Sequence, residues 1–144
     1  MFLGEYQHSL DAKGRVILPA KYRSQLDGGC VLTKGREPCV RVYPREEFIR
    51  VSDDLKGIPM SSAHARHGAR VFYSAASEQV PDGQGRVLIP ENLRRYAGLE
   101  RDLLIAGANQ YFEIWDRTRW ATEIEANQAR FSEIADEQHV DLPF

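Results

Sequence analysis

The sequence predicts a mixed α+β fold, mainly β, in which two copies of one small unit build a small mixed or antiparallel barrel. Residues 11–23 (DAKGRVILPAKYR) recur as residues 82–94 (DGQGRVLIPENLR), about 71 positions later. Each copy predicts the order β-β-α-β-β-α, without the long helical crossover that joins parallel strands. Because a repeated unit usually cannot bury its own apolar face, we expect the two copies to share one core.

In the first copy, residues 2–8 and 14–18 are predicted strands on either side of a turn at 11–14. Asp11 can close the turn with its carboxylate, and Gly14 can take a positive φ without steric cost. Pro19 keeps the preceding residue extended and begins a short helix, roughly 19–26. The remaining elements are strands at Cys30–Thr33 and Cys39–Tyr43, with a turn at Gly35, and a helix from Pro44 to Gly57 with Phe48, Val51 and Leu55 on its apolar face.

The second copy predicts the same order after a junction at residues 57–69, which we expect to contain a turn or two of helix capped by Ser61 or Ser62. The predicted elements are a strand from Arg70 to about Ser77, a turn at Asp82–Gly85, a strand at Val87–Ile89, a helix from Pro90 and strands near 102–106 and 111–115. Asp116 is then expected to cap a longer helix to about Gln138, with Trp120, Ile124, Phe131 and Ile134 on its apolar face.

The composition is that of a soluble globular protein of 144 residues, with 42% hydrophobic and 28% charged residues. No apolar run approaches the ~20 residues of a membrane span, and the first residues lack the pattern of a secretory signal. We therefore expect a cytoplasmic protein. Cys30 and Cys39 stand apart from each other and from histidine, which favours buried free thiols over a disulfide or a metal site.

The net charge of −2 is unevenly distributed along the chain. Residues 113–144 contain eight acidic and three basic side chains, a balance of −5, so residues 1–112 carry +3. Residues 10–26 alone carry four basic side chains against one acidic side chain. The local field governs association with a polyanion more than the total charge does, so this segment favours a basic patch that contacts a polyanion.

The repeated Asp-x-x-Gly-Arg motif has two compatible interpretations. Asp and Arg four residues apart across a turn can pair and fix the guanidinium, which then either covers the barrel or projects to a ligand. Enzyme motifs are not recognisable: position 88 is Leu where a dinucleotide fingerprint needs Gly, and there is no Walker lysine or Gly-x-Ser-x-Gly motif. His64 and His67 lack a third ligand nearby, and Asp53 and Asp54 are expected to be exposed.

These motifs, together with the opening MFLGEY, make the sequence closely similar to the MraZ family over nearly its whole length. Further matches are Tyr43-Pro44 with Phe48, the junction residues Ala63 and Ala65-Arg66, and Glu113-Ile114-Trp115 followed by Trp120. The resemblance implies tandem AbrB-like units whose hairpins swap into a double-psi β-barrel, with peripheral helices and a longer C-terminal helix. Their bounds are expected at residues 1–56 and 70–144, around the junction 57–69.

The resemblance also implies a function and a set of site residues. The family is described as bacterial transcriptional regulators of the division and cell-wall gene cluster, which form rings and bind repeated sites upstream of their own promoter. The residues carried over as DNA-binding are Lys13, Arg15, Lys21, Arg23, Arg86 and Arg94, and those carried over as structural parts of the motif are Asp11, Gly14, Asp82 and Gly85. Lys13 and Lys21 become Gln84 and Asn92 in the second copy, so we expect the first copy to be the main DNA face.

The leading hypothesis is a nucleoid-associated, sequence-specific DNA-binding regulator, most consistent with a repressor, that binds double-stranded DNA at direct repeats as a homo-oligomeric ring. It requires no cofactor, metal, membrane or small-molecule substrate. Two alternatives stay open. One is a ring-forming protein-interaction scaffold without direct DNA readout. The other is a small-molecule enzyme on the same scaffold, since a fold does not fix a function.

Overall fold

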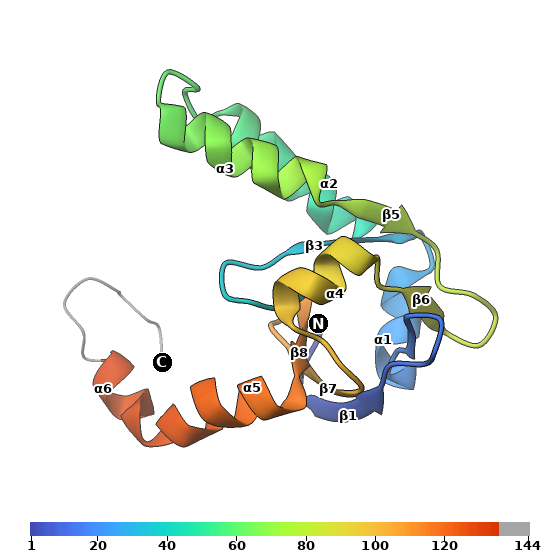
Figure 1. Cartoon of the computed structure of the whole chain (residues 1–144). Helices are drawn as coiled ribbons and strands as arrows, with labels where there is room; N and C mark the ends of the chain where they lie inside the picture. Colours follow the sequence, from blue (N-terminus) through green and yellow to red (C-terminus); the bar gives the residue numbers. More distant parts are fainter. Residues whose placement is uncertain (136–144) are drawn as a thin grey trace.

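The computed structural model describes residues 1–135 and has the predicted mixed α+β composition. The first copy comprises β1 (Glu5–Ser9), β2 (Arg15–Ile17), α1 (Ala20–Arg23), the 3-10 helix η1 (Ser24–Leu26), β3 (Cys30–Lys34), β4 (Val40–Pro44) and α2 (Arg45–Lys56). The second comprises α3 (Ala63–Ser74), β5 (Ser77–Gln79), β6 (Arg86–Leu88), α4 (Glu91–Ala97), β7 (Asp102–Gly107), β8 (Phe112–Asp116), α5 (Arg117–Glu123), η2 (Glu125–Arg130) and α6 (Phe131–Ala135). Figure 1 shows the strands gathered at one end of the α2–α3 pair.

The strand pairing crosses between the two copies. Six strands form an antiparallel sheet in the order β1-β7-β8-β4-β3-β5, so the first strand of each copy pairs with the third strand of the other. The fourth strands, β4 and β8, pair at the centre. The two strands that flank each Asp-x-x-Gly-Arg turn therefore pair with strands of the other copy and not with each other. This sheet is open, and closure into a double-psi barrel stays a prediction.

The remaining two strands, β2 and β6, form a separate antiparallel ribbon. Val16 faces Val87 at its centre, and hydrogen bonds from Leu18 N to Gly85 O (2.9 Å) and from Ile89 N to Gly14 O (2.8 Å) extend the pairing at both ends. Both central valines are buried. The ribbon therefore packs one face on the core and leaves the other outside.

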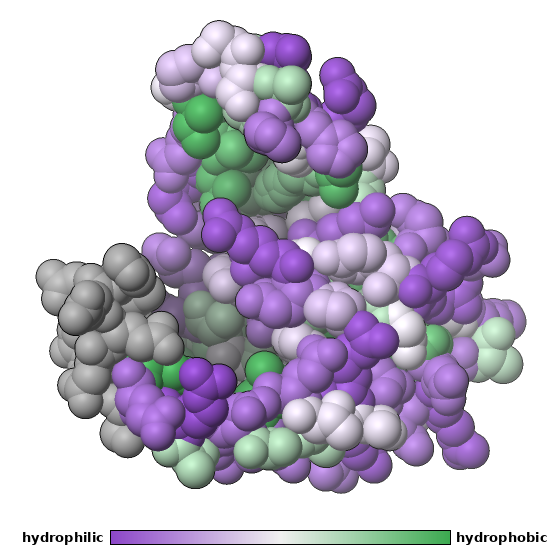
Figure 2. Space-filling view, turned by 60° about the vertical axis from the view of Figure 1, so that its left-hand side comes forward, coloured by the Kyte–Doolittle hydropathy of each residue, from purple (hydrophilic) through white to green (hydrophobic). Residues whose placement is uncertain are grey.

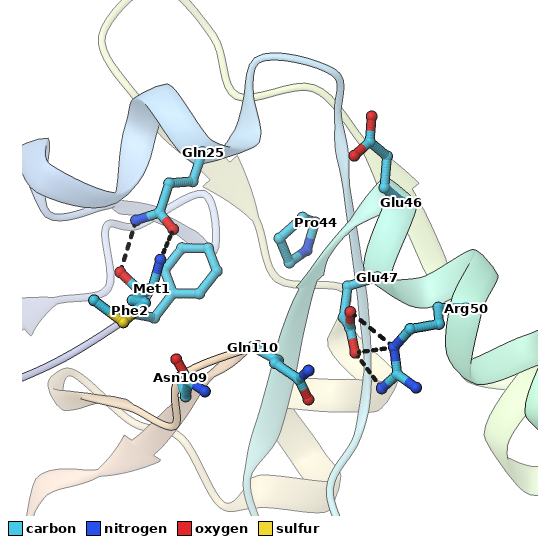
Figure 3. A pocket seen from close by; sticks show the side chains of 9 residues that line it. All are labelled: Met1, Phe2, Gln25, Pro44, Glu46, Glu47, Arg50, Asn109 and Gln110. Carbon is cyan, nitrogen blue, oxygen red and sulfur yellow. Dashed lines mark hydrogen bonds and ion pairs between the residues drawn. The ribbon is translucent and has the colours of Figure 1, made fainter.

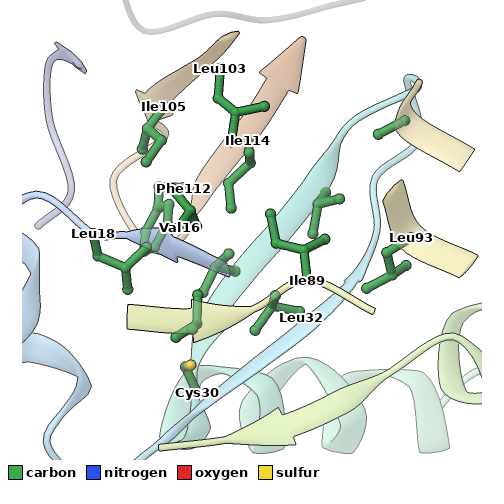
Figure 4. Close-up of a cluster of buried hydrophobic side chains, with 14 of the residues drawn as sticks. Val16, Leu18, Cys30, Leu32, Ile89, Leu93, Leu103, Ile105, Phe112 and Ile114 are labelled. Carbon is green, nitrogen blue, oxygen red and sulfur yellow. The ribbon is translucent and has the colours of Figure 1, made fainter. Parts of the chain in front are cut away.

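One hydrophobic core lies between the sheet, the ribbon and the short helices. Figure 4 shows side chains from β2, β3, β7, β8 and α4 pointing into the same space. The most deeply buried members include Leu18, Leu32, Ile89, Leu93, Leu103, Ile105, Phe112 and Ile114. Leu18 and Ile89 occupy equivalent places in the two copies, which explains why neither copy needs a complete core of its own.

Proline begins the equivalent helices of both copies, as predicted. Pro19 and Pro90 are the residues before α1 and α4, and Pro44 stands before α2. Gly98 ends α4 with φ of +62°, a left-handed conformation in which glycine has no steric penalty. Phe48, Val51 and Leu55 are half-buried on one face of α2, which confirms the predicted apolar stripe.

The strand predicted from Arg70 to about Ser77 was wrong, because α3 occupies residues 63–74 and only Ser77–Gln79 form a strand. Two interactions override the β propensity of Val71, Phe72 and Tyr73. The hydroxyl of Ser62 accepts a hydrogen bond from Ala65 N, which confirms that residue as the N-cap. The ring of Phe72 lies 5.4 Å from that of Phe48, so α3 packs along α2.

The helices α2 and α3 project from the sheet as a pair with no fully buried residue in either. Figure 2 shows apolar side chains gathered in a hollow between them. The hollow is lined by Tyr43, Val51, Leu55, Ile58, Met60, Val71 and Phe72, among others. Of these lining residues, Ile58 and Met60 are exposed.

The C-terminal helix is interrupted, contrary to the prediction of one continuous helix to Gln138. Asp116 caps α5 by accepting a hydrogen bond from Arg119 N, as expected, but the helix ends at Glu123 and continues as η2 and α6. Trp120 is buried against Trp115, and Ile124 packs beside them, whereas Phe131 and Ile134 are 59% and 39% exposed. The predicted end at Gln138 lies outside the described residues.

None of the helices in the described part of the chain is both long and apolar enough to span a membrane.

Cys30 and Cys39 are buried, as predicted, and burial raises the pKa of the Cys30 thiol to about 12. His64 and His67 are exposed on α3, and Asp53 and Asp54 are exposed on α2.

We predict that Trp120→Ala lowers the free energy of unfolding by about 3 kcal/mol, because it removes a buried indole from its contact with Trp115. Ile134→Ala, at an exposed position of the same segment, should change it by less than about 0.5 kcal/mol. Urea denaturation of both variants provides the measurement. Equal, small decreases would contradict packing of α5 on the sheet.

Candidate nucleic-acid interface

The first Asp-x-x-Gly-Arg motif forms a tight turn in which one carboxylate makes three hydrogen bonds. Oδ1 of Asp11 accepts from the backbone N–H groups of Lys13 and Arg15, both at 2.9 Å, and Oδ2 accepts from Nε of Arg15 at 2.9 Å. The backbone closes the turn through Gly14 N to Asp11 O (3.1 Å) and Asp11 N to Arg15 O (2.8 Å). The carboxylate thus fixes both the turn and the arginine that follows it.

The second motif repeats this geometry. Oδ1 of Asp82 accepts from the N–H groups of Gln84 and Arg86 at 2.9 Å, and Oδ2 accepts from Nε of Arg86 at 2.7 Å. The Arg15 and Arg86 side chains are 29% and 26% exposed. The pairing of Asp with Arg across the turn is therefore present in both copies, and it is compatible with a contact to a ligand.

These hydrogen bonds lower the pKa of Asp11 and of Asp82, the bond from the backbone N–H of the arginine being the largest cause in each. Both carboxylates therefore stay ionised well below neutral pH. Each arginine uses Nε in its turn. Within residues 1–135, the terminal Nη nitrogens of Arg15 and Arg86 make no hydrogen bond, so they remain available to a partner.

Each turn is covered by an arginine from the other copy. Gly14 and Gly85 have φ of +80° and +77° and are buried. A Cβ added at Gly14 would lie 2.8 Å from Nη1 of Arg94 on α4, and one added at Gly85 would meet the guanidinium of Arg23 at the end of α1. Two composite basic sites result, in each of which one copy supplies the turn and the other the covering arginine.

The β2–β6 ribbon places the two composite sites on one structure, with one turn before each strand. Arg15 lies opposite Leu88, and Arg86 lies opposite Ile17. Because β2 and β6 are antiparallel, the two turns stand at opposite ends of the ribbon, roughly 13 Å apart for four residues of strand. Of the predicted residues, Lys13, Arg15, Arg23, Arg86 and Arg94 therefore belong to one region. Lys21 is exposed on α1 and forms no hydrogen bond or ion pair within residues 1–135, so neither turn holds it.

Sequence reasoning missed two residues of this region. Ile17 and Leu88 are each 46% exposed on the outer face of the ribbon. The signal was the alternation of Arg15, Val16 and Ile17, and of the corresponding residues in the second copy, which puts the residue after the buried valine on the same face as the arginine. Sequence reasoning also missed Gln79, whose side chain bonds to both backbone groups of Leu88.

The other cavities offer less chemistry. The pocket in Figure 3 lies between the N-terminus and α2. Two pairs of its lining residues bond to each other: the Gln25 side chain bonds to the backbone of Met1, and Glu47 pairs with Arg50. In the described part of the chain, the carboxyl groups with a shifted pKa are Asp11 and Asp82, and neither lines this pocket. Within residues 1–135, no group of three or more His, Cys, Asp or Glu side chains lies close enough together to hold a metal ion.

The fold and the site define a class of duplicated α+β proteins in which two repeats share one core and present the same arginine turn on a common ribbon. The family model described as "MraZ protein, putative antitoxin-like" matches this chain twice, over residues 1–71 and 72–142. The chain therefore belongs to the MraZ family, as the sequence motifs predicted.

Curated relatives support this assignment over nearly the full length. The chain is 51% identical over 138 residues to a protein of Thermobifida fusca, with 95% of this chain and 96% of the relative covered. It is 47% identical over 137 residues to a protein of Frankia casuarinae, with the same coverage of both chains. A protein of Kocuria rhizophila is 50% identical over 137 residues, again with 95% and 96% covered. Each relative is named "Transcriptional regulator MraZ".

We predict that Gly14→Ala and Gly85→Ala each destabilise the protein by roughly 1–2 kcal/mol, since a Cβ is disfavoured at positive φ. Each should also displace the covering arginine. Gly83→Ala is the matched control, because it lies in the same turn as Gly85 with nothing within 4 Å of an added Cβ. Chemical denaturation measures the three variants. A destabilisation at Gly83 as large as at Gly14 and Gly85 would contradict the assignment of the cost to positive φ and to the covering arginine.

Proposed function

We propose that this protein is a sequence-specific DNA-binding transcriptional regulator and that the β2–β6 ribbon with its two turns is its DNA-binding surface. The observation that carries the proposal is the pair of arginines held in the same pose by Asp11 and Asp82, each next to an arginine from the other copy. Arginine held in a fixed pose suits phosphate and guanine, which accept two hydrogen bonds side by side.

The charge distribution supports this surface. Residues 113–135, which lie in β8, α5, η2 and α6, carry five acidic and three basic side chains, a balance of −2. In Figure 1, α5, η2 and α6 extend to the left of the strands, away from β6 on the right. The acidic residues of α5, η2 and α6 therefore lie away from the ribbon, and charges separated by more than a Debye length are largely screened at physiological salt. Ion pairs elsewhere, such as Arg50 with Glu47 and Asp54, neutralise basic residues outside the ribbon.

The finer features implied by the resemblance belong to the same proposal. We propose that the two units, residues 1–56 and 70–144 around the junction 57–69, form a swapped-hairpin double-psi β-barrel. We propose further that the protein represses its own division and cell-wall gene cluster at direct repeats upstream of the promoter, in the cytoplasm on the nucleoid. Support for the barrel comes from the cross-copy pairing of β1 with β7, β3 with β5 and β2 with β6.

The assembly that we propose is a homo-oligomeric ring. Support comes from the exposed apolar hollow between α2 and α3, because a patch of this kind on a soluble protein is typical of an interaction site. The same observation favours the alternative function, a ring-forming protein-interaction scaffold without direct DNA readout. In that case the arginines of the ribbon would be dispensable for every binding activity. We propose no catalytic activity.

We predict that Arg15→Ala and Arg86→Ala both weaken DNA binding. Each should reduce the slope of log affinity against log salt by about 0.9 for every phosphate that the variant no longer neutralises. Arg15→Ala should have the larger effect, because Lys13 makes the first turn more positive than the second, which has Gln84. The measurement is a salt titration of binding to DNA from upstream of its own gene.

Arg50→Ala is the control, an exposed arginine on α2 outside the ribbon. If the Arg15→Ala and Arg86→Ala variants stay folded and their affinity for DNA equals that of the wild type, the scaffold alternative is favoured. Unfolding of either variant would instead assign the arginine to the stability of the turn.

We predict that the operator consists of direct repeats at about one helical turn, ~10 base pairs, rather than a palindrome. A ring presents the same surface repeatedly in one orientation, so DNA along it meets consecutive copies of that surface. Affinity should rise steeply with repeat number, since later contacts are intramolecular. Binding to one, two and three direct repeats is compared with binding to an inverted pair, with sedimentation of the free protein. Equal binding to a single inverted pair, or a two-fold dimer in solution, would contradict the ring.

A further inference from the structure

The outer face of the β2–β6 ribbon carries two aliphatic side chains as well as two arginines. Arg15 lies opposite Leu88 and Ile17 lies opposite Arg86, so the four side chains form a two-by-two patch with like residues on the diagonals. Directly opposite residues on one face have Cβ atoms about 4.5–5.5 Å apart. Each arginine therefore has an aliphatic side chain both across the ribbon and two residues along its own strand.

The exposure of Ile17 and Leu88 is the same in the two copies, 46% each. Single exposed aliphatic residues are common on protein surfaces and need no explanation. Here, however, the exposed residue recurs at the equivalent position of both copies and next to the one arginine that each turn fixes. Because the position repeats, we infer that the two aliphatic side chains belong to the same binding surface as the two arginines.

The ribbon has a shape that DNA accepts. A two-stranded antiparallel ribbon fits the major groove, which is about 12 Å wide. The backbone of Leu88 is fixed on its outer edge by Gln79, which accepts from Leu88 N at 2.9 Å and donates to Leu88 O. This leaves the Leu88 side chain as the group of that residue available to a partner in the groove.

We propose, resting on the function proposed above, that Ile17 and Leu88 contact the C5-methyl groups of thymines in the major groove and so determine part of the sequence specificity. The arginines on the other diagonal supply charge and contacts to guanine or phosphate. In the major groove a thymine differs from cytosine partly by this methyl group, and an aliphatic side chain detects it by contact. Ile17 and Leu88 are two residues apart along the ribbon, about 7 Å, which corresponds to about two base-pair steps.

A second copy of the chain is the other class of partner that an aliphatic patch can accept. Charge complementarity favours DNA, because the two turns and their covering arginines contain five basic side chains against two acidic ones, so a symmetric contact between copies would bring positive regions together. The five basic residues are Lys13, Arg15, Arg23, Arg86 and Arg94, and the two acidic residues are Asp11 and Asp82. Free-protein sedimentation of the variants below separates the two cases.

The experiment uses a duplex selected on the wild-type protein from a random pool. The duplex is prepared with thymine and again with uracil at every thymine position, which removes the methyl groups and keeps all base-pairing groups. We expect the wild-type full-length protein to bind the uracil duplex about fourfold more weakly for each methyl group contacted, the effect of burying one methyl group. The Ile17→Ala/Leu88→Ala variant should bind the two duplexes equally.

The variant controls for any change in duplex flexibility, because it binds the same two DNAs. Ile49→Ala, which removes an aliphatic side chain of 43% exposure from α2, should discriminate the duplexes as the wild type does. Wild-type binding that is equal on both duplexes overturns the inference and leaves the proposed function intact, whereas failure to bind any duplex rejects the proposed function itself. A variant that binds equally to both only because its oligomeric state has changed also overturns the inference, in favour of an interface between copies.

Discussion

The structure depends on one constraint, that the first two strands of each copy pair only with strands of the other copy. β1 pairs with β7, β5 with β3, and β2 with β6. An unpaired edge in an isolated unit would expose backbone N–H and C=O groups and leave Val16 or Val87 without its opposite partner. The same crossing brings α1 beneath the second turn and α4 beneath the first, so that Arg23 and Arg94 each cover a glycine of the other copy. The candidate interface is therefore a product of the pairing and could not be formed by either copy alone.

The hydrogen bonds within each Asp-x-x-Gly-Arg turn determine the conformation of the arginine that the ribbon exposes. One carboxylate accepts two backbone N–H groups and one guanidinium N–H, which reduces the rotational freedom of an arginine that would otherwise lose about 2 kcal/mol of side-chain entropy on binding. The ion pair is partly exposed and contributes little stability by itself. The ion pair instead orients the guanidinium, and a side chain that is already held in one conformation loses less entropy when it binds a partner.

The local features were predictable from the sequence, and the non-local ones were not. The turns at Asp11 and Asp82, the proline starts of α1, α2 and α4, and the buried cysteines follow from neighbouring residues. The strand predicted at Arg70 failed because a cap at Ser62 and the contact of Phe72 with Phe48 outweighed the β propensity of the segment. The covering of each turn by Arg23 or Arg94 joins residues more than 60 positions apart, and no local pattern encodes it. The exposure of Ile17 and Leu88 follows from the alternation of side chains along a strand. Sequence reasoning overlooked it because the neighbouring arginines are the more usual sign of a DNA-binding surface.

The crossing of strands also bears on how the chain is made. Ser9 pairs with Asp102, 93 positions further along, and β1 has no other strand partner among the described residues. At a synthesis rate of about 5–20 residues per second, β1 waits roughly 5–20 s for the strand that it joins. During that interval the growing chain exposes an unpaired strand and half of a core, which is a target for chaperones and for a second nascent chain on the same message.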